Sequence, residues 1–221
     1  MLHIDNVEVF GWEAAIRGMR NPINSWEKSD SGNVILNEED VIFGYPPDIE
    51  YQVGQNDLKL MKSLVKSGTD HSKFMRMINV TMDITAPLYW LKEFDTYKVG
   101  TVTNSCSTMH KIHSKEFSLD DFSYEHLGDA ELKLLQTIIE AMNESRSAFV
   151  NWDEHYEHEK KDYWWQMIQL LPSSYNQKRT VQLNYQVLRS IYHARKTHKL
   201  DEWHTFCKEI EKLPYAELIV D

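Results

Sequence analysis

The stretch from Leu171 to His198 constrains the fold of this chain more than any other, because it contains a helix break followed by a helix face of mixed character. Pro172 cannot continue a helix and pushes Leu171 into an extended conformation, so we expect one helix to end there and a polar connection to follow. Asn184 is then a suitable start for a new helix. That helix carries one stripe of residues that is apolar in its middle and polar at both ends: Asn184, Leu188, Ile191, Arg195 and His198.

The residues alone leave two interpretations of this stripe open. In the first, Asn184 caps the helix, and Arg195 and His198 reach solvent at the helix end. In the second, the amide, guanidinium and imidazole groups point inward. A buried guanidinium without a partner is costly, so Arg195 would then need either a carboxylate or a bound anionic or planar group.

Composition and charge exclude several classes of function. A chain of 221 residues suits one domain, and 42% hydrophobic residues are enough for a proper core. The net charge of −10 argues against binding to a nucleic-acid backbone, whereas a single nucleotide needs only a local group of cations. The two cysteines give neither a disulfide framework nor a metal quartet. We find no signal peptide and no run of membrane-spanning length, and we expect a cytoplasmic protein without a membrane partner.

The pattern of extended and helical segments predicts an α+β fold, with mixed strands and long helices around a central sheet. Strands are expected at 2–10 and 74–84, and a further extended segment at 34–47. Helices are expected at 12–19, 55–66, 86–94, 129–156, 164–171 and 202–213, besides the one from Asn184. Between two of them, residues 95–110 form a polar, hydroxyl-rich loop of the kind that often carries function.

Two further clusters have a functional and a plain interpretation. Arg17, Arg20 and Lys28 lie among small hydroxyl residues and Gly/Pro punctuation, which is typical either of a phosphate cradle or of an ordinary loop. Glu154, His155 and His158 lie within one turn of each other at the end of the long helix. The chain lacks the paired Glu-x-x-His pattern of di-iron bundles, so we interpret this end as a solvated, charged surface and expect no metal.

Four short motifs follow one another along the chain. The first two are the aromatic-Trp pair Tyr89-Trp90 and the polar run Asn104-Ser105-Cys106-Ser107. In the third, Asn184 lies twelve residues after Pro172, Arg195 lies eleven residues after Asn184, and His198 follows. The fourth is Glu202-Trp203.

Together these motifs resemble the flavin-dependent thymidylate synthases. The polar run matches the second half of the family signature, and the spacing from Pro172 to Arg195 is that of the family. His198 is displaced by about one position, and Glu202-Trp203 stands where a Gln-Trp is usual. The resemblance covers roughly 68–212 of a single domain, 1–221.

The departures from the family pattern fall on residues that hold flavin and substrate phosphate. The Arg-His-Arg of the signature is replaced by Asp95-Thr96-Tyr97 or by Tyr97-Lys98-Val99, depending on where an insertion falls. The family's Glu becomes Ser105, and an Arg on the second strand becomes Met109. Another Arg, four residues before the Leu-Pro proline, becomes Ile168.

The resemblance implies that FAD and a pyrimidine deoxynucleotide such as dUMP bind side by side, with no side-chain nucleophile. It further implies reductive methylation of the uracil ring, with a folate as one-carbon donor and NADPH as reductant. The residues implied to contact the cofactor are Asn104, Ser107, Asn184 and His198. Those implied to contact the substrate are Ser105, Ser107 and Arg195, with Lys98, Arg17 and Arg20 replacing lost cationic charge. For Arg195, our hypothesis therefore chooses the nucleotide over a carboxylate.

The resemblance also implies a homotetramer with ligand sites at subunit junctions, which suits a chain with seven Trp and eleven Tyr. Two alternatives to a thymidylate synthase stay open. Each charge-assisted phosphate contact contributes about 1.5–3 kcal/mol, so the loss of the Arg-His-Arg is compatible with a catalytically lapsed or altered flavin- and nucleotide-binding oligomer. The other alternative is a flavin-dependent enzyme whose altered loop reads another base.

Overall fold

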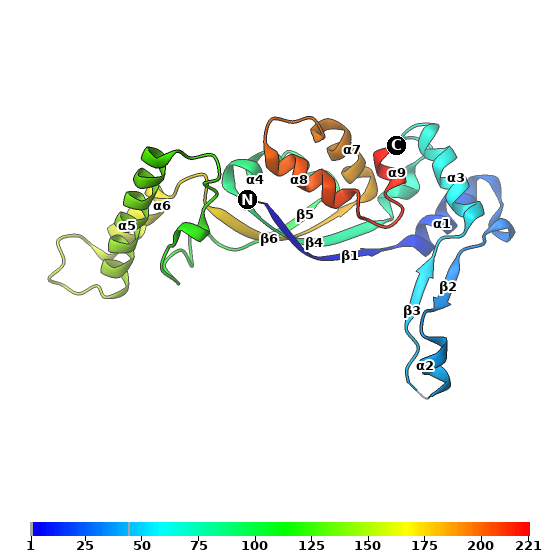
Figure 1. The fold of residues 1–221 in the computed structure, drawn as a ribbon, viewed down its shortest axis with the longest axis horizontal. Helices are drawn as coiled ribbons and strands as arrows, with labels where there is room; N and C mark the ends of the chain where they lie inside the picture. Colours follow the sequence, from blue (N-terminus) through cyan, green and yellow to red (C-terminus); the bar gives the residue numbers. More distant parts are fainter. Residues whose placement is uncertain (1, 44) are drawn as a thin grey trace.

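A four-stranded antiparallel sheet forms the centre of the molecule (Figure 1). The computed structural model describes residues 2–43 and 45–221. In spatial order the strands are β1 (His3–Phe10), β4 (Asn79–Pro87), β6 (Asn176–Asn184) and β5 (Val102–Ser105). Strand β6 therefore bonds to two neighbours, pairing Val80 of β4 with Leu183 and Thr103 of β5 with Val181.

Helices cover one face of the sheet, and the main hydrophobic core lies between this face and the helices. Along β4 the buried residues alternate with partly exposed ones, so that Val80, Met82 and Ile84 point toward the helices. The covering helices are α4 (Leu88–Phe94), α7 (Tyr185–Arg195), α8 (Asp201–Ile210) and α9 (Glu217–Val220) (Figure 1). Trp90 and Trp203 are fully buried between α4 and α8 with ring centroids 4.7 Å apart. Burying each such side chain stabilises the fold by about 1.5–3 kcal/mol.

The other face of the sheet is open and polar. Asp83 lies at its centre and accepts hydrogen bonds from Thr180 at 2.6 Å and from Asn6 at 2.9 Å. Lys178 forms an ion pair with the same carboxylate at 3.0 Å. These three groups lower the pKa of Asp83 to about 2, Thr180 contributing most.

Two parts of the chain project from the sheet at opposite ends (Figure 1). At one end lie α1 (Trp12–Arg20), α3 (Gln55–Lys66) and an arm that we define as residues 32–52, made of β2 (Gly32–Ile35), α2 (Glu38–Ile42) and β3 (Ile49–Gln52). At the other end, α5 (Asp129–Val150) and α6 (Lys160–Leu170) form a lobe with its own small core around Leu135, Met142 and Met167. The short 3-10 helices are η1 (Asn21–Ile23), η2 (Trp26–Lys28), η3 (Lys73–Arg76) and η4 (Leu119–Asp121). No described helix combines the length and hydrophobicity needed to cross a lipid bilayer.

The α+β prediction is confirmed, and the helices expected at 12–19 and 55–66 are present as α1 and α3. The prediction of a polar connection between Leu171 and Asn184 is wrong, because most of this segment forms strand β6. Its Lys178, Thr180 and Gln182 lie on the open polar face, so this strand carries no long apolar run. The predicted loop 95–110 likewise contains β5, an edge strand with every residue exposed.

Three other boundaries differ from the expectation. The extended segment expected at 34–47 is a hairpin arm with α2 at its tip, apart from Gly44, which lies outside the described residues. The strand expected from Phe74 begins only at Asn79, after η3. The long helix expected to reach Tyr156 ends at Val150, and residues 151–159 form turns with Glu154, His155 and His158 exposed.

Asp83 gives the open face a testable pH dependence. Its folded pKa of about 2 lies below the ordinary 3.8, so the carboxylate stabilises the fold above about pH 4, and this contribution fades as pH falls toward 2. We expect Asp83→Asn to melt at a lower temperature than wild type at pH 7, and the two melting temperatures to converge toward pH 2. Asp70→Asn, which removes an exposed loop carboxylate, is the control. A gap that stayed constant down to pH 2 would contradict this role.

Candidate functional site

A pocket of about 390 Å³ lies where β6 turns into α7. One wall is the loop between α4 and β5, and the other is the first two turns of α7. The lining residues are Arg76, Thr96, Tyr97, Lys98, Val99, Gly100, Asn184, Gln186, Val187 and Ser190. We call this the α7 pocket.

Asn184 shapes the α7 pocket because it ends the strand and caps the helix. Its side-chain oxygen accepts a hydrogen bond from the backbone N–H of Val187 at 3.0 Å, as a helix cap does, and the residue is buried. Gly100 adopts φ +81°, and a Cβ there would lie 2.9 Å from Asn184 Nδ2 and 3.2 Å from Val187 Cγ2. A larger residue would fill this cradle, so only glycine allows the loop to approach the helix start.

The α7 pocket is electropositive. Lys98 and Arg76 both line it, both are exposed, and neither forms an ion pair within the described part of the chain. The N-terminal end of α7 adds a partial positive charge, although the N–H groups of Tyr185 and Val187 already donate to Ile78 O and to Asn184 Oδ1. The sequence analysis predicted Lys98 and Asn184 as site residues but missed Arg76. Nothing in the sequence marks Arg76 except that it is a cation shortly before a strand.

At the far end of α7, Arg195 has partners from its own chain. Its Nη1 donates to Glu93 Oε2 at 3.1 Å and its Nε donates to the Tyr97 hydroxyl at 2.9 Å. The guanidinium also lies 4.8 Å from the centroid of the Trp203 ring, whose Nε1 donates to the same Glu93 oxygen at 3.0 Å. Of the two partners considered for Arg195, the structure therefore provides the carboxylate, which differs from the nucleotide of our hypothesis.

His198 belongs to the same cluster, beyond the end of the helix. Its Nε2 lies 3.5 Å from Glu93 Oε2, and its Nδ1 accepts the backbone N–H of Leu200 at 3.2 Å. Tyr97 connects the α7 pocket with the Arg195 cluster, because it lines the pocket and its hydroxyl accepts a hydrogen bond from Arg195. The stripe predicted from the sequence is therefore real, but its two ends face different surroundings.

The residues expected from the signature loop are not brought together with Asn184. Asn104 of β5 pairs with Thr180, so its side chain lies on the open face of the sheet, opposite the helices. Ser105 pairs with Arg179 and points to the other face. Ser107 is exposed and accepts the backbone N–H groups of Met109 and His110, which makes a local turn.

Neither cysteine lines the α7 pocket. Cys106 is exposed at the end of β5, and Cys207 is buried in α8. Burial, followed by the nearby Glu211, raises the pKa of the Cys207 thiol to about 11. A thiol in that state is a poor nucleophile.

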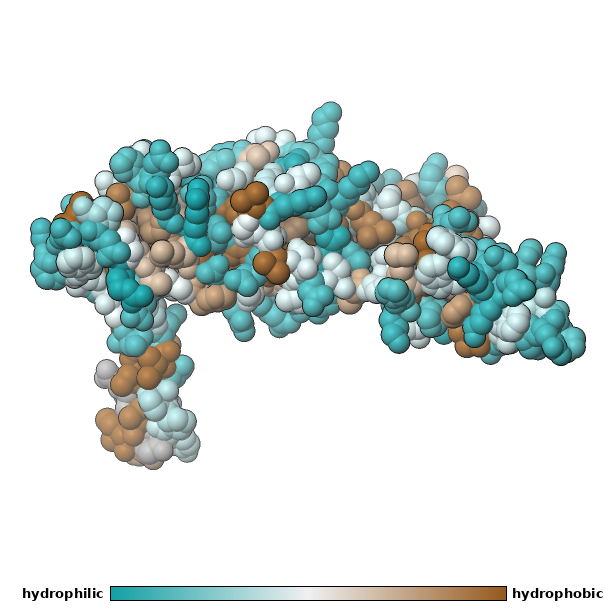
Figure 2. Space-filling view, turned by 180° about the vertical axis from the view of Figure 1, so that it is seen from behind, coloured by the Kyte–Doolittle hydropathy of each residue, from teal (hydrophilic) through white to brown (hydrophobic). Residues whose placement is uncertain are grey.

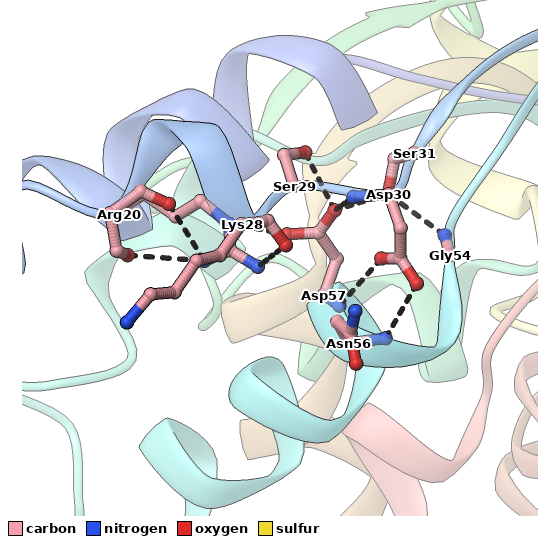
Figure 3. A network of polar contacts seen from close by, with 9 residues as sticks. Arg20, Lys28, Ser29, Asp30, Ser31, Gly54, Asn56 and Asp57 are labelled. Carbon is pink, nitrogen blue, oxygen red and sulfur yellow. Dashed lines mark hydrogen bonds and ion pairs between the residues drawn. The ribbon is translucent and has the colours of Figure 1, made fainter.

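The expectation that Arg20 contacts substrate needs correction. Its guanidinium is only 4% exposed and pairs at 2.7 Å with Asp57, which is fully buried. The remaining N–H groups donate to Ser25 and to the backbone oxygen of Lys28 (Figure 3). A buried carboxylate required a cation, and Arg20 supplies it. Removing one partner of such a pair costs about 3–5 kcal/mol.

Asp57 organises the base of the arm through the same network. Ser29 and Ser31 each donate a hydroxyl to Asp57 Oδ2 at 2.7 Å, while Asp30 accepts the backbone N–H groups of Asn56 and Asp57 and so caps α3 (Figure 3). Burial raises the pKa of Asp57, but the hydrogen bonds from Ser31, Ser29 and Arg20 together outweigh it, and the net shift is downward.

Arg17, in contrast to Arg20, is exposed and lies apart from the α7 pocket. It is 3.6 Å from Glu13 on the same helix and lines a separate hollow of about 290 Å³ with Trp26 and Tyr51. Arg20 and Ser29 line the same hollow, so the structure brings part of the predicted phosphate cradle together, but away from the α7 pocket and with the Arg20 guanidinium held by Asp57.

Comparison of the structure with solved structures gives full-length matches, whereas neither a protein-family model nor a curated protein matches the sequence. Thymidylate synthase X (ThyX) from Helicobacter pylori, solved with FAD and dUMP, aligns over 100% of this chain and 97% of its own with a TM-score of 0.64 and 16% identity. The chain has the fold of the flavin-dependent thymidylate synthases.

Two further matches agree with this fold. A second structure of the flavin-dependent thymidylate synthase ThyX from Helicobacter pylori covers 98% of this chain and 97% of its own, at 17% identity and a TM-score of 0.62. The UMP/dUMP methylase PolB from Streptomyces cacaoi, bound with 5-Br dUMP, covers 96% and 88% at 11% identity and a TM-score of 0.55. The resemblance found in the sequence motifs to flavin-dependent thymidylate synthases is confirmed at the level of the fold.

Arg195→Lys separates a structural guanidinium from a ligand contact. Lysine cannot stack on Trp203 or bond to Glu93 and Tyr97 together, so we expect a loss of about 1–2 kcal/mol in the free energy of unfolding. We expect the affinity for FAD and for dUMP to stay within a factor of two. Denaturant unfolding and calorimetric titration measure the two quantities. Glu93→Gln is the matched variant and should lower stability in the same way. Unchanged stability with lost dUMP binding would place Arg195 in the ligand site instead.

Proposed function

We propose that this chain binds FAD and a pyrimidine deoxynucleotide such as dUMP, and that a phosphate-bearing part of one of them lies in the α7 pocket. The observation that supports this most is that the pocket unites Lys98 and Asn184, which two different motifs of the sequence had singled out. The relatives of the same fold were solved with FAD and dUMP or with 5-Br dUMP.

The residues of the α7 pocket fit a phosphate. Lys98 and Arg76 supply two cations that form no ion pair in the described part of the chain, and the N-terminal end of α7 adds the partial positive charge of the helix dipole. Gly100 leaves a cradle that a side chain would fill. Ser190, one turn further along α7, adds a hydroxyl to the lining.

The size of the pocket limits what one chain holds. A volume of about 390 Å³ is near the lower end for small-molecule sites. It suits a mononucleotide or half of a dinucleotide, but not FAD and dUMP together. A complete site therefore requires a second surface, in agreement with an oligomer whose subunits share their ligands.

When bound, reduced flavin supplies hydride for methylation of the uracil ring, with the carbon coming from a folate. The chain's own contribution is to bind the phosphate with Lys98 and Arg76 and to fix the loop at Gly100 against α7. Asn184 holds that helix start in place through its bond to Val187. No side chain of the pocket needs to act as a nucleophile.

A second candidate is a flavin- and nucleotide-binding oligomer that does not methylate. It is favoured by the neutralised charges beside the pocket. Asp95, which begins one of the two segments that stand in the place of the Arg-His-Arg, forms an ion pair with Arg179 at 2.6 Å, and nearby Glu93 binds Arg195. Both cations are thereby occupied by carboxylates of the chain, and a substrate would have to displace them.

Lys98→Ala tests the proposed site. The loss of one charge-assisted phosphate contact, about 1.5–3 kcal/mol, predicts affinity for FAD or dUMP weaker by roughly 10- to 150-fold, with an unchanged melting temperature because Lys98 is exposed. Gly100→Val should abolish binding of the same ligand, because a side chain at φ +81° that meets Asn184 and Val187 forces the loop away from α7. Arg17→Ala removes an exposed cation outside the α7 pocket and is the control. Equal affinities in all three variants and wild type would refute the α7 pocket as the site.

The same proteins separate the two candidates. Conversion of dUMP to dTMP by wild type, supplied with reduced flavin and a folate one-carbon donor, supports the enzyme. Binding of both ligands with no dTMP formed supports the second candidate.

A further inference from the structure

The arm exposes an unusual amount of apolar surface at its tip. Ile42 and Phe43 are each 81% exposed, and Figure 2 shows hydrophobic residues gathered on this projection. The other strongly exposed apolar residues of the arm are Leu36, Tyr45 and Ile49. A contiguous apolar patch on a projecting element is costly in water and typically marks an interaction site.

The tip is also acidic. Residues 36–50 include Glu38, Glu39, Asp40, Asp48 and Glu50, and no Lys or Arg. This charge disfavours docking onto an anionic lipid surface or onto nucleic acid. The chemistry that fits such a tip is a basic surface with some apolar character.

The same end of the molecule carries a surface of that kind. Lys59, Lys62 and Lys66 follow one another along α3 and line a shallow, open surface together with the partly buried Leu58; all of its lining residues lie within 55–67. Lys59 and Lys66 form no ion pair in the described chain, and Lys62 pairs only with Glu217 at 3.1 Å. The one acidic residue of α3, Asp57, is buried against Arg20. We call this the α3 groove.

The arm cannot reach the α3 groove of its own chain. The network around Asp57 and Asp30 ties the base of the arm to the start of α3 (Figure 3). From that base, β2 and β3 lead the tip away from α3 (Figure 1). The two complementary surfaces therefore lie at one end of the molecule but apart from each other.

We propose that the arm tip of one protomer docks in the α3 groove of a second copy of this chain. Because tip and groove lie at the same end, a two-fold axis lets each protomer supply one tip and one groove, which closes the contact into a symmetric pair. The apolar tip supplies buried area and the lysines supply orientation. The pairing does not depend on the proposed ligands.

Two variants test the contact separately. Ile42→Ser/Phe43→Ser alters the tip, and Lys59→Glu/Lys66→Glu alters the groove. Both change only exposed residues, so circular dichroism and melting temperature should match wild type. We expect light scattering to give, for either variant, an assembly mass of half the wild-type value or less. Lys133→Glu/Lys161→Glu, exposed residues of the distant lobe, is the charge-matched control and should assemble as wild type does.

A charge swap gives the sharpest result. Glu38→Lys/Glu39→Lys/Asp40→Lys carries a basic tip and a basic groove, whereas Lys59→Glu/Lys66→Glu carries an acidic tip and an acidic groove. Each alone should stay unpaired, and a mixture of the two should form pairs, because both tip–groove contacts are then complementary.

Three results would overturn the proposal. The first is a monomer mass for wild type at every concentration. The second is an unchanged assembly in both the tip and the groove variants. The third is a wild type that floats with phosphatidylcholine vesicles through Ile42 and Phe43 while staying monomeric, which would assign the tip to a lipid surface.

Discussion

Strand β6 is the element on which the other parts of the fold rely, because it bonds to β4 on one side and to β5 on the other. Its last residue, Asn184, also caps α7, so the end of the sheet fixes where that helix begins. Gly100 then brings the loop from α4 against this junction. The α7 pocket exists because strand, helix start and loop meet at one point, and it would be lost if β6 shifted by one residue.

Some cations of the chain form ion pairs with its own carboxylates and stabilise the fold, whereas others have no such partner and are available to a ligand or to another protein. Arg20, Arg179 and Arg195 each bind a carboxylate of the same chain, at 2.7, 2.6 and 3.1 Å. These pairs fix the arm base, the position of β6 against the end of α4, and the end of α7. Lys98 and Arg76 at the α7 pocket, and Lys59 and Lys66 at the α3 groove, have no such partner in the described residues. In a chain of net charge −10, these cations differ from other unpaired ones in that they line a pocket or a groove, where they are placed to meet another molecule.

The sequence predicts the features that depend on near neighbours. The break at Pro172, the helix start at Asn184 and the full extent of α3 follow from local backbone chemistry and helical periodicity. Strand β6 escapes prediction because one of its faces is polar and its pairing partners lie far away in the chain. Arg20 is misassigned for a similar reason, since nothing nearby reveals that Asp57, 37 residues on, is buried beside it. Likewise, the spacing that places Arg195 on the inner stripe does not show that Glu93 lies beside it.

Amide hydrogen exchange with and without ligand tests most directly whether the junction of β6, α7 and the 96–100 loop binds a nucleotide phosphate. We predict that saturating FAD or dUMP slows exchange at 96–100 and at 184–190, and leaves the arm base at 25–31 unchanged. Slower exchange confined to other segments, or no change anywhere with either ligand, would contradict phosphate binding at this junction.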